Sequence, residues 1–229
     1  RTMLKGDPGG CIRVRALGGL GAALCMHLEY QEGLQRLEQA LAESSEQPLL
    51  EAARHDRARI LINLGAAHCE QHRVDAGQRC VEQAMTTLAP LLRARRAGAR
   101  ADFGRAAMNL GSIHSRAGRL EASVAAFEQA IDALDRAART VRRSGDALRL
   151  QATRGKASMN LAYTLFKAGD FDAGERHFAA ALRRYGPALL QSRPQLRADL
   201  ARTRVNAARL AQGRGQSQRA ATLYAQALQ

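Results

Sequence analysis

Apolar and polar positions alternate along most of this chain with the period of an α-helix, and short breaks divide it into pairs of helices. The segment RAAMNLGSIHSRAGRLEASVAAFEQAI, residues 105–131, shows this pattern clearly. Its apolar residues recur every three or four positions on both sides of a break at Ala117-Gly118, which predicts two amphipathic helices joined by a turn. Proline is rare, and glycine tends to stand at the ends of such segments. The pattern predicts an all-α protein.

The helical pair occurs five times. The copies align on a small anchor residue in the first helix: Gly21, Gly65, Gly111, Ala162 and Ala208. Seven residues after the anchor, where the first helix is expected to end, stand Leu28, His72, Gly118, Gly169 and Gly215. Small residues stand twelve positions after the anchor, bulky residues sixteen after it, and alanine nineteen after it in every copy. Small and large residues in a fixed register allow two helices to interlock and to stack on the next pair.

This pattern resembles the tetratricopeptide repeat (TPR) family from about Arg15 to the end of the chain. The resemblance implies an all-α, right-handed superhelical solenoid of about five TPR-like helical hairpins. The anchors lie 44 to 51 residues apart, whereas the typical repeat has about 34 residues. We therefore expect long helices with extra turns, within residues 91–102 and 135–155.

The expected repeats lie near residues 15–47, 48–98, 99–145, 146–190 and 191–229. Pro48 and Pro194 are expected to open the first helices of the second and fifth repeats, because proline is favoured in a first turn. Residues 1–14 contain Gly-Asp-Pro-Gly-Gly and are expected to form a linker or the frayed end of a preceding element. We expect the chain to be part of a longer protein.

A basic residue and an asparagine recur on one stripe of the first helices. Six residues before the anchor stand Arg15, Arg59, Arg105, Lys156 and Arg202, and two residues before it stand Asn63, Asn109, Asn160 and Asn206, with Gly19 in the first copy. Positions four residues apart lie only about 40° apart around a helix. The position after the anchor, which is Ser112, Tyr163 or Arg209 in the later copies, falls on the same side. The stripe is expected to face away from the packed core.

Such a stripe has the chemistry to bind an extended peptide. A carboxamide can donate to a peptide carbonyl and accept from a peptide N–H, and arginine forms forked bonds to carboxylates. Methionines beside the stripe offer adaptable apolar contacts. The predicted peptide-binding residues are Arg59, Asn63, Arg105, Met108, Asn109, Ser112, Lys156, Met159, Asn160, Tyr163, Arg202, Asn206 and Arg209. Two other interpretations stay open: the asparagines bond to the neighbouring repeat, or the arginines form a solvated face.

The phrases RAAMNLG and KASMNLA also resemble the Arg-x-x-x-Asn-Leu-Gly signature of the Pins/LGN adaptors, and the NLA form is similar to kinesin light chain. In those families the resemblance implies a concave inner groove that captures extended, often acidic peptides through the arginine and asparagine side chains. The match is good in repeats two to four and weaker in repeats one and five.

The charge of the chain agrees with an acidic partner. The formal net charge is +14, and all but three of the 35 basic residues are arginine; such a balance favours anionic partners. We therefore predict a non-enzymatic scaffold that binds an acidic, extended segment of another protein. One alternative is a nucleic-acid-binding module, although Tyr163 is the one aromatic residue of the stripe available for base stacking. Another is the regulatory or oligomer-forming repeat region of a larger signalling protein.

Other chemistry is not predicted. The four cysteines are irregularly spaced, which favours reduced thiols and a cytoplasmic location over a disulfide framework. The HCEQH segment at residues 68–72 lacks the order of a zinc-protease motif, and its histidine at position 68 is expected to pack in the core. Asp170 and Asp172 are explained by helix capping. We predict no catalytic residue, no metal site, no cofactor and no membrane insertion.

Overall fold

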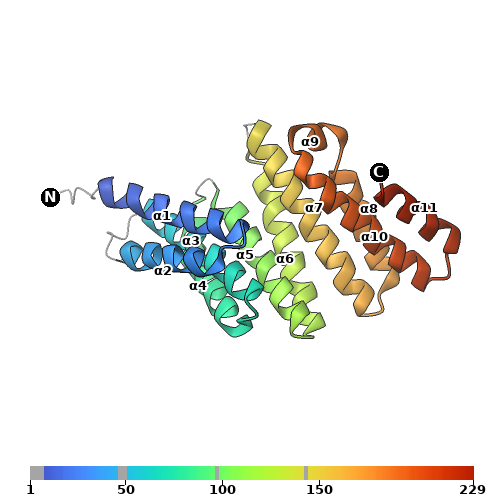
Figure 1. Ribbon diagram of the computed structural model, residues 1–229, viewed down its shortest axis with the longest axis horizontal. Coiled ribbons are helices and arrows are strands. Elements are labelled where there is room, and N and C mark those ends of the chain that lie inside the picture. The colour runs from blue at the N-terminus through green and yellow to red at the C-terminus, as the bar shows by residue number, and fades with distance from the viewer. Residues whose placement is uncertain (1–7, 46–50, 96–97, 142–143) are drawn as a thin grey trace. The chain divides into compact units, whose positions relative to one another are not determined.

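The computed structural model describes residues 8–45, 51–95, 98–141 and 144–229, and these residues form helices and the turns between them (Figure 1). The all-α prediction is therefore confirmed. The chain divides into two compact units, Arg1–Ile113 and His114–Gln229, with the boundary inside the fifth helix. Each unit is described by itself.

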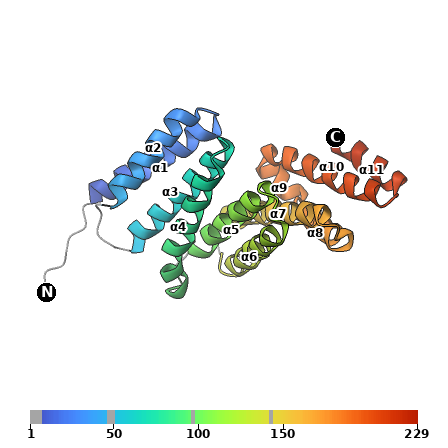
Figure 2. The ribbon, with the colours of Figure 1, turned by 90° about the horizontal axis from the view of Figure 1, so that it is seen from below.

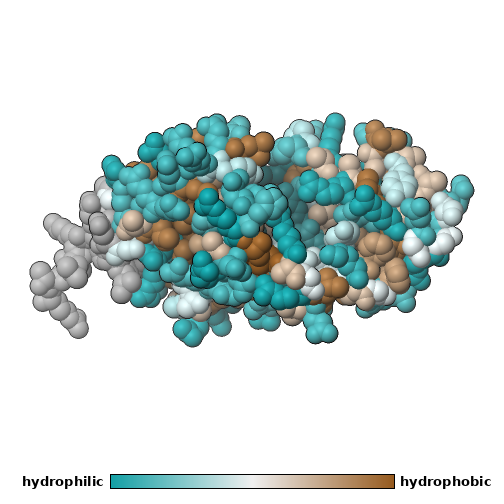
Figure 3. Space-filling view, turned by 60° about the horizontal axis from the view of Figure 1, so that its bottom comes forward, coloured by the Kyte–Doolittle hydropathy of each residue, from teal (hydrophilic) through white to brown (hydrophobic). Residues whose placement is uncertain are grey.

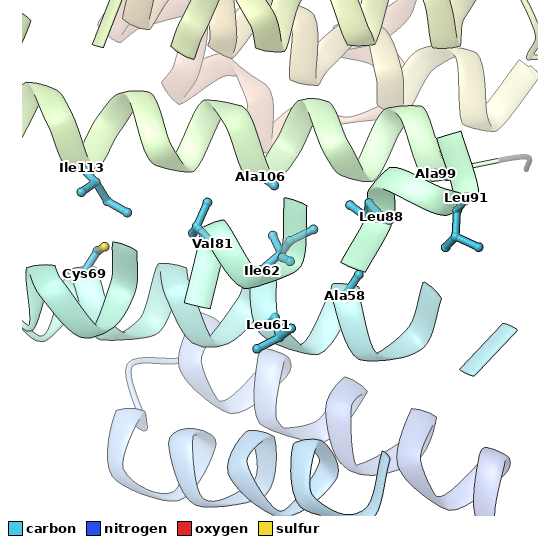
Figure 4. Packing of buried hydrophobic residues seen from close by; sticks show 11 residues of the cluster. Ala58, Leu61, Ile62, Cys69, Val81, Leu88, Leu91, Ala99, Ala106 and Ile113 are labelled. Atoms are coloured by element: carbon cyan, nitrogen blue, oxygen red, sulfur yellow. The ribbon is translucent and has the colours of Figure 1, made fainter. Parts of the chain in front are cut away.

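The first unit contains two helical hairpins and most of a fifth helix. Helices α1 (Pro8–Met26) and α2 (Tyr30–Ser45) form the first hairpin, α3 (Glu51–Glu70) and α4 (Val74–Arg93) form the second, and α5 (Ala99–Arg116) follows them (Figure 2). Buried side chains from α1, α2 and α3, including Val14, Leu37 and Leu64, make one core layer. A second layer joins α3, α4 and α5, where Leu61, Ile62, Leu88, Leu91 and Ile113 are almost fully buried (Figure 4).

Glycine at the anchor positions of the first two hairpins allows the two helices of each of them to approach closely. A Cβ atom on Gly65 would lie 2.6 Å from Cγ2 of Val81 and 3.1 Å from the carbonyl oxygen of Gly77. A Cβ atom on Gly21 would meet the carbonyl oxygen of Gly33 at 2.8 Å. Such distances are below van der Waals contact, so the small residues of the repeat pattern are required by helix–helix packing.

The second unit begins with the end of α5 and contains α6 (Leu120–Ala138), α7 (Ser144–Lys167), α8 (Phe171–Arg184), the short α9 (Pro187–Ser192), the 3₁₀ helix η1 (Pro194–Leu196), α10 (Arg197–Gly213) and α11 (Ser217–Ala227). Helices α7 and α8 pack as one hairpin, and α10 and α11 as the next (Figure 1). Met159, Phe178 and Leu210 bring α7, α8 and α10 into one core. Tyr185 is buried beside Gly155, where a Cβ atom would lie 3.0 Å from the tyrosine ring.

The turn after every first helix has a residue in the left-handed conformation, at the position predicted for the helix end. The φ angles are 68° at Leu28, 59° at His72, 74° at Gly118, 86° at Gly169 and 73° at Gly215. Glycine adopts this conformation without steric cost, whereas leucine and histidine do not. The five turns therefore share one backbone geometry, and three of them have glycine, the preferred residue, at this position.

Within residues 91–102 and 135–155, where extra helical turns were expected, residues 91–93, 99–102, 135–138 and 144–155 are helical, whereas residues 94–95, 98 and 139–141 are not, so the expectation holds for part of each segment. Helix α7 alone has 24 residues, and α9 is an additional short helix. Pro194 opens η1, which runs directly into α10, and the side chain of Asp170 caps α8 by accepting from the backbone N–H of Ala173 at 2.9 Å. Pro48 lies outside the described residues.

The expectation of a linker over residues 1–14 is wrong for residues 8–14. Helix α1 begins at Pro8, a residue that suits the first turn of a helix because its fixed φ is helical and its missing N–H has no partner there. Val14 is buried in the core with Leu34 and Leu37, which stabilises the helix across this segment. Residues 1–7 lie outside the described residues.

Candidate functional site

In the first unit, the recurring basic residues form ion pairs with aspartates of the following first helix. Arg15 Nε on α1 lies 2.5 Å from Oδ2 of Asp56 on α3. Arg59 on α3 approaches Asp102 on α5 at 3.9 Å. These arginines are about half exposed, so each pair adds little stability, but together they link successive first helices along the stripe.

Asp102 is the centre of this network. Its side chain is only 13% exposed, and its carboxylate accepts from Nη1 of Arg105 at 2.9 Å and from Nε2 of His55 at 2.8 Å. Burial acts to raise the pKa of this carboxyl, but the hydrogen bond from His55 and the charges of Arg105 and Arg59 outweigh it and hold the pKa below its usual value. Asp102 is therefore a charged, buried and fully partnered carboxylate.

The same pairing occurs in the second unit, where Nζ of Lys156 on α7 lies 2.9 Å from Oδ2 of Asp199 on α10. All three acceptors stand three residues before the basic residue of their own helix, in the order Asp-x-x-Arg: Asp56, Asp102 and Asp199. Helix α7 has Thr153 at this position. The aspartates were missed by the sequence analysis, although the alignment of the repeats contains this signal.

The asparagines of the first unit bond between neighbouring first helices. Nδ2 of Asn109 on α5 donates to the carbonyl oxygen of Ile62 on α3 at 3.4 Å, and Oδ1 of Asn63 accepts from Nη2 of Arg105 at 3.2 Å. Ser112 donates to the carbonyl oxygen of Met108 within α5, and the Met108 side chain is half-buried. In this unit, one of the open interpretations holds: the amides link adjacent repeats.

The second unit differs, because its asparagines have no such partner. Asn160 on α7 and Asn206 on α10 are partly exposed, and neither side chain has a hydrogen-bond partner within the described part of the chain. Arg202 and Arg209 on α10 are exposed and form no ion pair with any described carboxylate. Tyr163 on α7 is 36% exposed.

These residues share one face. On α7, positions 156, 160 and 163 are spaced as one helical stripe, and on α10, positions 199, 202, 206 and 209 are spaced likewise. The Lys156–Asp199 ion pair joins the two stripes. We define the α7–α10 face by the following residues: Lys156, Asn160, Tyr163, Asp199, Arg202, Asn206 and Arg209.

Met159 is not part of this face, which corrects the prediction. Its side chain is 5% exposed and packs with Phe178 on α8 and with Ala207 and Leu210 on α10. The position beside the asparagine faces the neighbouring helices here, so its apolar side chain is buried in the core rather than placed at the edge of a binding surface.

An aromatic cluster continues from Tyr163 towards the end of α7. The ring centroids of Tyr163 and Phe166 are 6.4 Å apart, and those of Phe166 and Phe171 are 5.8 Å apart in an edge-on arrangement. Phe171 is 36% exposed. Elsewhere exposed apolar side chains are scattered, and the face in Figure 3 is mostly hydrophilic with small separate apolar patches. The cluster gives the α7–α10 face an apolar border.

Other candidate chemistry has a structural explanation. Cys69 is buried where α3 meets Gly77 of α4, and all four cysteines are free thiols. Burial is the main cause that lowers the pKa of His68, and the charges of Arg73 and Arg79 act in the same direction against that of Glu38. Within the described ranges, no group of three or more histidine, cysteine, aspartate or glutamate side chains is placed to hold a metal ion. No described helix combines the length and the apolar character needed to cross a bilayer.

Comparison with known proteins identifies the fold. Residues 104–133 match the family model described as tetratricopeptide repeat. The crystal structure of BtubC (BKLC) from P. vanneervenii covers 94% of this chain and 80% of its own length, with a TM-score of 0.70 and 19% identity. The chain has the TPR fold.

Two further solved structures extend the comparison. The TPR-like repeats of a kinesin light chain from Podosopora anserina cover 94% of this chain and 93% of their own length, with a TM-score of 0.61 and 19% identity. Aspartyl phosphate phosphatase F from Bacillus subtilis matches with a TM-score of 0.63 and 12% identity, and this TPR chain spans 59% of its length. No curated protein sequence matches the chain significantly. The similarity to kinesin light chain is thus confirmed at the level of the fold.

Proposed function

We propose that this chain is a non-enzymatic TPR scaffold and that the α7–α10 face binds an extended, acidic segment of another protein. The observation that carries the proposal is the contrast between the two units. Asn63 and Asn109 are used in contacts between helices, whereas Asn160 and Asn206 are partly exposed without a partner among the described residues. A carboxamide in that state can bind the backbone of an extended peptide whatever its side chains.

Charge supports the acidic character of the segment. Arg202 and Arg209 flank Asn206 and have no carboxylate partner within the described residues, whereas Lys156 is paired with Asp199. Forked, charge-assisted bonds from these two guanidiniums would select aspartate or glutamate side chains. The Tyr163–Phe166–Phe171 cluster would receive an apolar side chain at one end of the segment.

The comparisons support the class of function but not the partner. Kinesin light chain repeats and BtubC share the fold at 19% identity, and helical-repeat arrays in general present extended surfaces used for binding. The phosphatase named among the similar structures is a longer protein. Our proposal takes from these proteins the use of the fold as a binding scaffold and takes no catalytic role.

Selection from a displayed library of random 12-residue peptides would test the proposal, with fluorescence anisotropy to measure the selected peptides. We expect enrichment in aspartate and glutamate and a loss of about tenfold or more in affinity for the double variant Asn160→Ala/Asn206→Ala, since two peptide-backbone bonds are removed. The matched control is Asn63→Ala/Asn109→Ala, which removes the same group at the equivalent positions of the first unit. Equal loss in both variants, or none in either, would contradict the proposal.

A nucleic-acid partner is an outcome of the same experiment. If a single-stranded oligonucleotide displaces the selected peptides and its affinity falls steeply as the salt concentration rises, nucleic acid rather than a peptide is the ligand of this face.

The double variant Arg202→Gln/Arg209→Gln is expected to lower the affinity for acidic peptides more than the affinity for neutral ones.

A further inference from the structure

A second surface feature lies in the unit His114–Gln229, apart from the α7–α10 face. It is a cavity of about 490 Å³ walled by α6, α7 and α8. Three alanines (Ala138, Ala147 and Ala180), Gln151 and three arginines (Arg154, Arg183 and Arg184) line it. Its volume lies within the range of about 300–1,000 Å³ typical of pockets for small ligands.

The charges around this cavity are not balanced. Arg154 binds Asp135 on α6 through Nε and Nη2, both at 2.5 Å, and Nη2 of Arg184 lies 3.9 Å from the same carboxylate. Arg183 has no ion pair with any described residue. Two of the three guanidiniums therefore share the single carboxylate of Asp135, and the third has no counter-ion among the described residues, which leaves an excess of two positive charges at the cavity.

The Arg184 guanidinium is held in place by further hydrogen bonds. Nη1 of Arg184 donates to Oγ of Ser158 at 3.3 Å and to the carbonyl oxygen of Ala180 at 3.2 Å. Nε2 of Gln151 donates to the carbonyl oxygen of Arg184 at 2.7 Å. Burial and the neighbouring charge of Arg154 lower the pKa of Arg184 in spite of Asp135. A bound anion would relieve this repulsion without reorganising the side chains.

The cavity is distinct from the proposed peptide site because it lies on the opposite side of α7. Ala147, Gln151 and Arg154 each stand nine residues before Lys156, Asn160 and Tyr163, respectively. Nine residues correspond to two and a half helical turns, so the two sets point in opposite directions.

We propose that this cavity is a binding site for a small organic phosphate. A phosphate monoester carries nearly two negative charges at neutral pH, which matches the excess of two guanidiniums. Arginine donors suit its oxygen atoms, and the three alanine side chains provide apolar surface for the organic part. The lining has no aromatic ring on which a nucleobase could stack.

Isothermal titration calorimetry with glycerol 3-phosphate as the probe tests this site on the unmodified chain. We expect saturable binding at one site, with glycerol not bound and inorganic phosphate bound more weakly because it lacks the organic part. Equal affinity for inorganic phosphate and glycerol 3-phosphate would overturn the assignment to an organic phosphate. No binding of glycerol 3-phosphate would overturn the site itself.

Variants of α8 supply a matched comparison. Arg183→Gln is expected to lower the affinity for glycerol 3-phosphate about tenfold, because it removes an unpaired guanidinium without breaking an ion pair. Arg176→Gln removes the same charge from an exposed position of the same helix outside the cavity and should change the affinity less than twofold. Equal effects of the two variants would show binding to general positive charge and overturn the proposal.

A second variant keeps all three arginines and adds a competing carboxylate. Ala147→Glu places this group at the cavity wall from an exposed position of α7. We expect the same loss of glycerol 3-phosphate binding, with the helical circular dichroism signal unchanged. Full retention of affinity in this variant would contradict a site at this cavity.

Discussion

Nε2 of His55 lies 2.8 Å from Oδ2 of Asp102 and donates to it, so that a residue near the start of α3 is joined to one in the first turn of α5. The same carboxylate serves Arg105 and Arg59. One buried aspartate thus neutralises side chains from two successive first helices. Its removal would leave His55 and Arg105 without their common acceptor and Arg59 without its ion-pair partner.

The first prediction concerns this aspartate. Asp102→Asn should lower the free energy of unfolding by about 1–3 kcal/mol at pH 7, because cationic partners lose their buried counter-charge. Urea denaturation followed by circular dichroism measures the change. Asp132→Asn is the control, since Asp132 is 59% exposed in a surface pair with Arg136, and it should have little effect.

The same variant has a defined pH dependence. The pKa of Asp102 is lower in the folded chain than its usual value, so its charge stabilises the fold at pH values above about 3.9, the usual value for aspartate. That stabilisation is lost as the pH falls through the folded-state pKa. The difference between the unmodified chain and Asp102→Asn should therefore shrink in acid; a constant difference from pH 7 to pH 2 would contradict the proposed role of charge.

The second prediction separates the asparagines by their contacts. Asn109→Ala should be less stable than Asn160→Ala by about 0.5–1.5 kcal/mol, because only Asn109 bonds to a neighbouring helix, at the carbonyl oxygen of Ile62. Both variants gain the same helix propensity from alanine. The difference between their free energies of unfolding therefore reports the hydrogen bond from Asn109 to Ile62. Thermal and urea denaturation of the two variants in parallel would reveal the difference, and equal stabilities would refute it.

The third prediction compares two helical glycines. Gly65→Ala should destabilise the chain by about 1–3 kcal/mol, because the added Cβ would overlap Val81 in the tightest part of the second hairpin. Gly19→Ala should stabilise it by about 0.5–1 kcal/mol, since Gly19 is exposed inside α1 with nothing within 4 Å of the added carbon. The sign of each change is read from urea denaturation midpoints.

The fourth prediction concerns Tyr185, a residue 4% exposed whose hydroxyl has no hydrogen-bond partner among the described residues. The Thr203 hydroxyl donates instead to the carbonyl oxygen of Asp199 at 2.7 Å. Burial raises the pKa of Tyr185. Tyr185→Phe should therefore leave the free energy of unfolding unchanged or raise it by up to about 1 kcal/mol. A clear loss of stability would show that the hydroxyl is satisfied in solution.

Much of the fold could be predicted from the sequence because packing is repeated. The small anchor residues (three glycines and two alanines), the alanines nineteen residues later and the left-handed turn positions each occur five times, so one weak pattern gains strength from its copies. The start of α1 was not predicted, since Gly-Asp-Pro-Gly-Gly favours a turn locally and only the burial of Val14 among α2 residues stabilises a helix there.

The site was predicted less completely because the register of the repeats does not show which polar groups bond to one another. Whether an asparagine of the stripe is free depends on the neighbouring helix: Asn109 bonds to Ile62, whereas Asn160 has no described partner. The burial of Met159 could not be predicted from its position in the repeat either, since it depends on how α7 is rotated against α8 and α10. The aspartates were overlooked because each one pairs with the basic residue of the preceding repeat, although Asp102 also bonds to Arg105 of its own helix.

These ion pairs have a consequence for how such a chain can change its length. Helix α3 carries Asp56, which accepts from Arg15 of the hairpin before it, and Arg59, which forms an ion pair with Asp102 of the hairpin after it. A tandem gene duplication of this hairpin would bring both halves of the pairing with it. The inserted copy would find a complementary charge on each side, so growth by whole hairpins leaves no buried carboxylate without a cation.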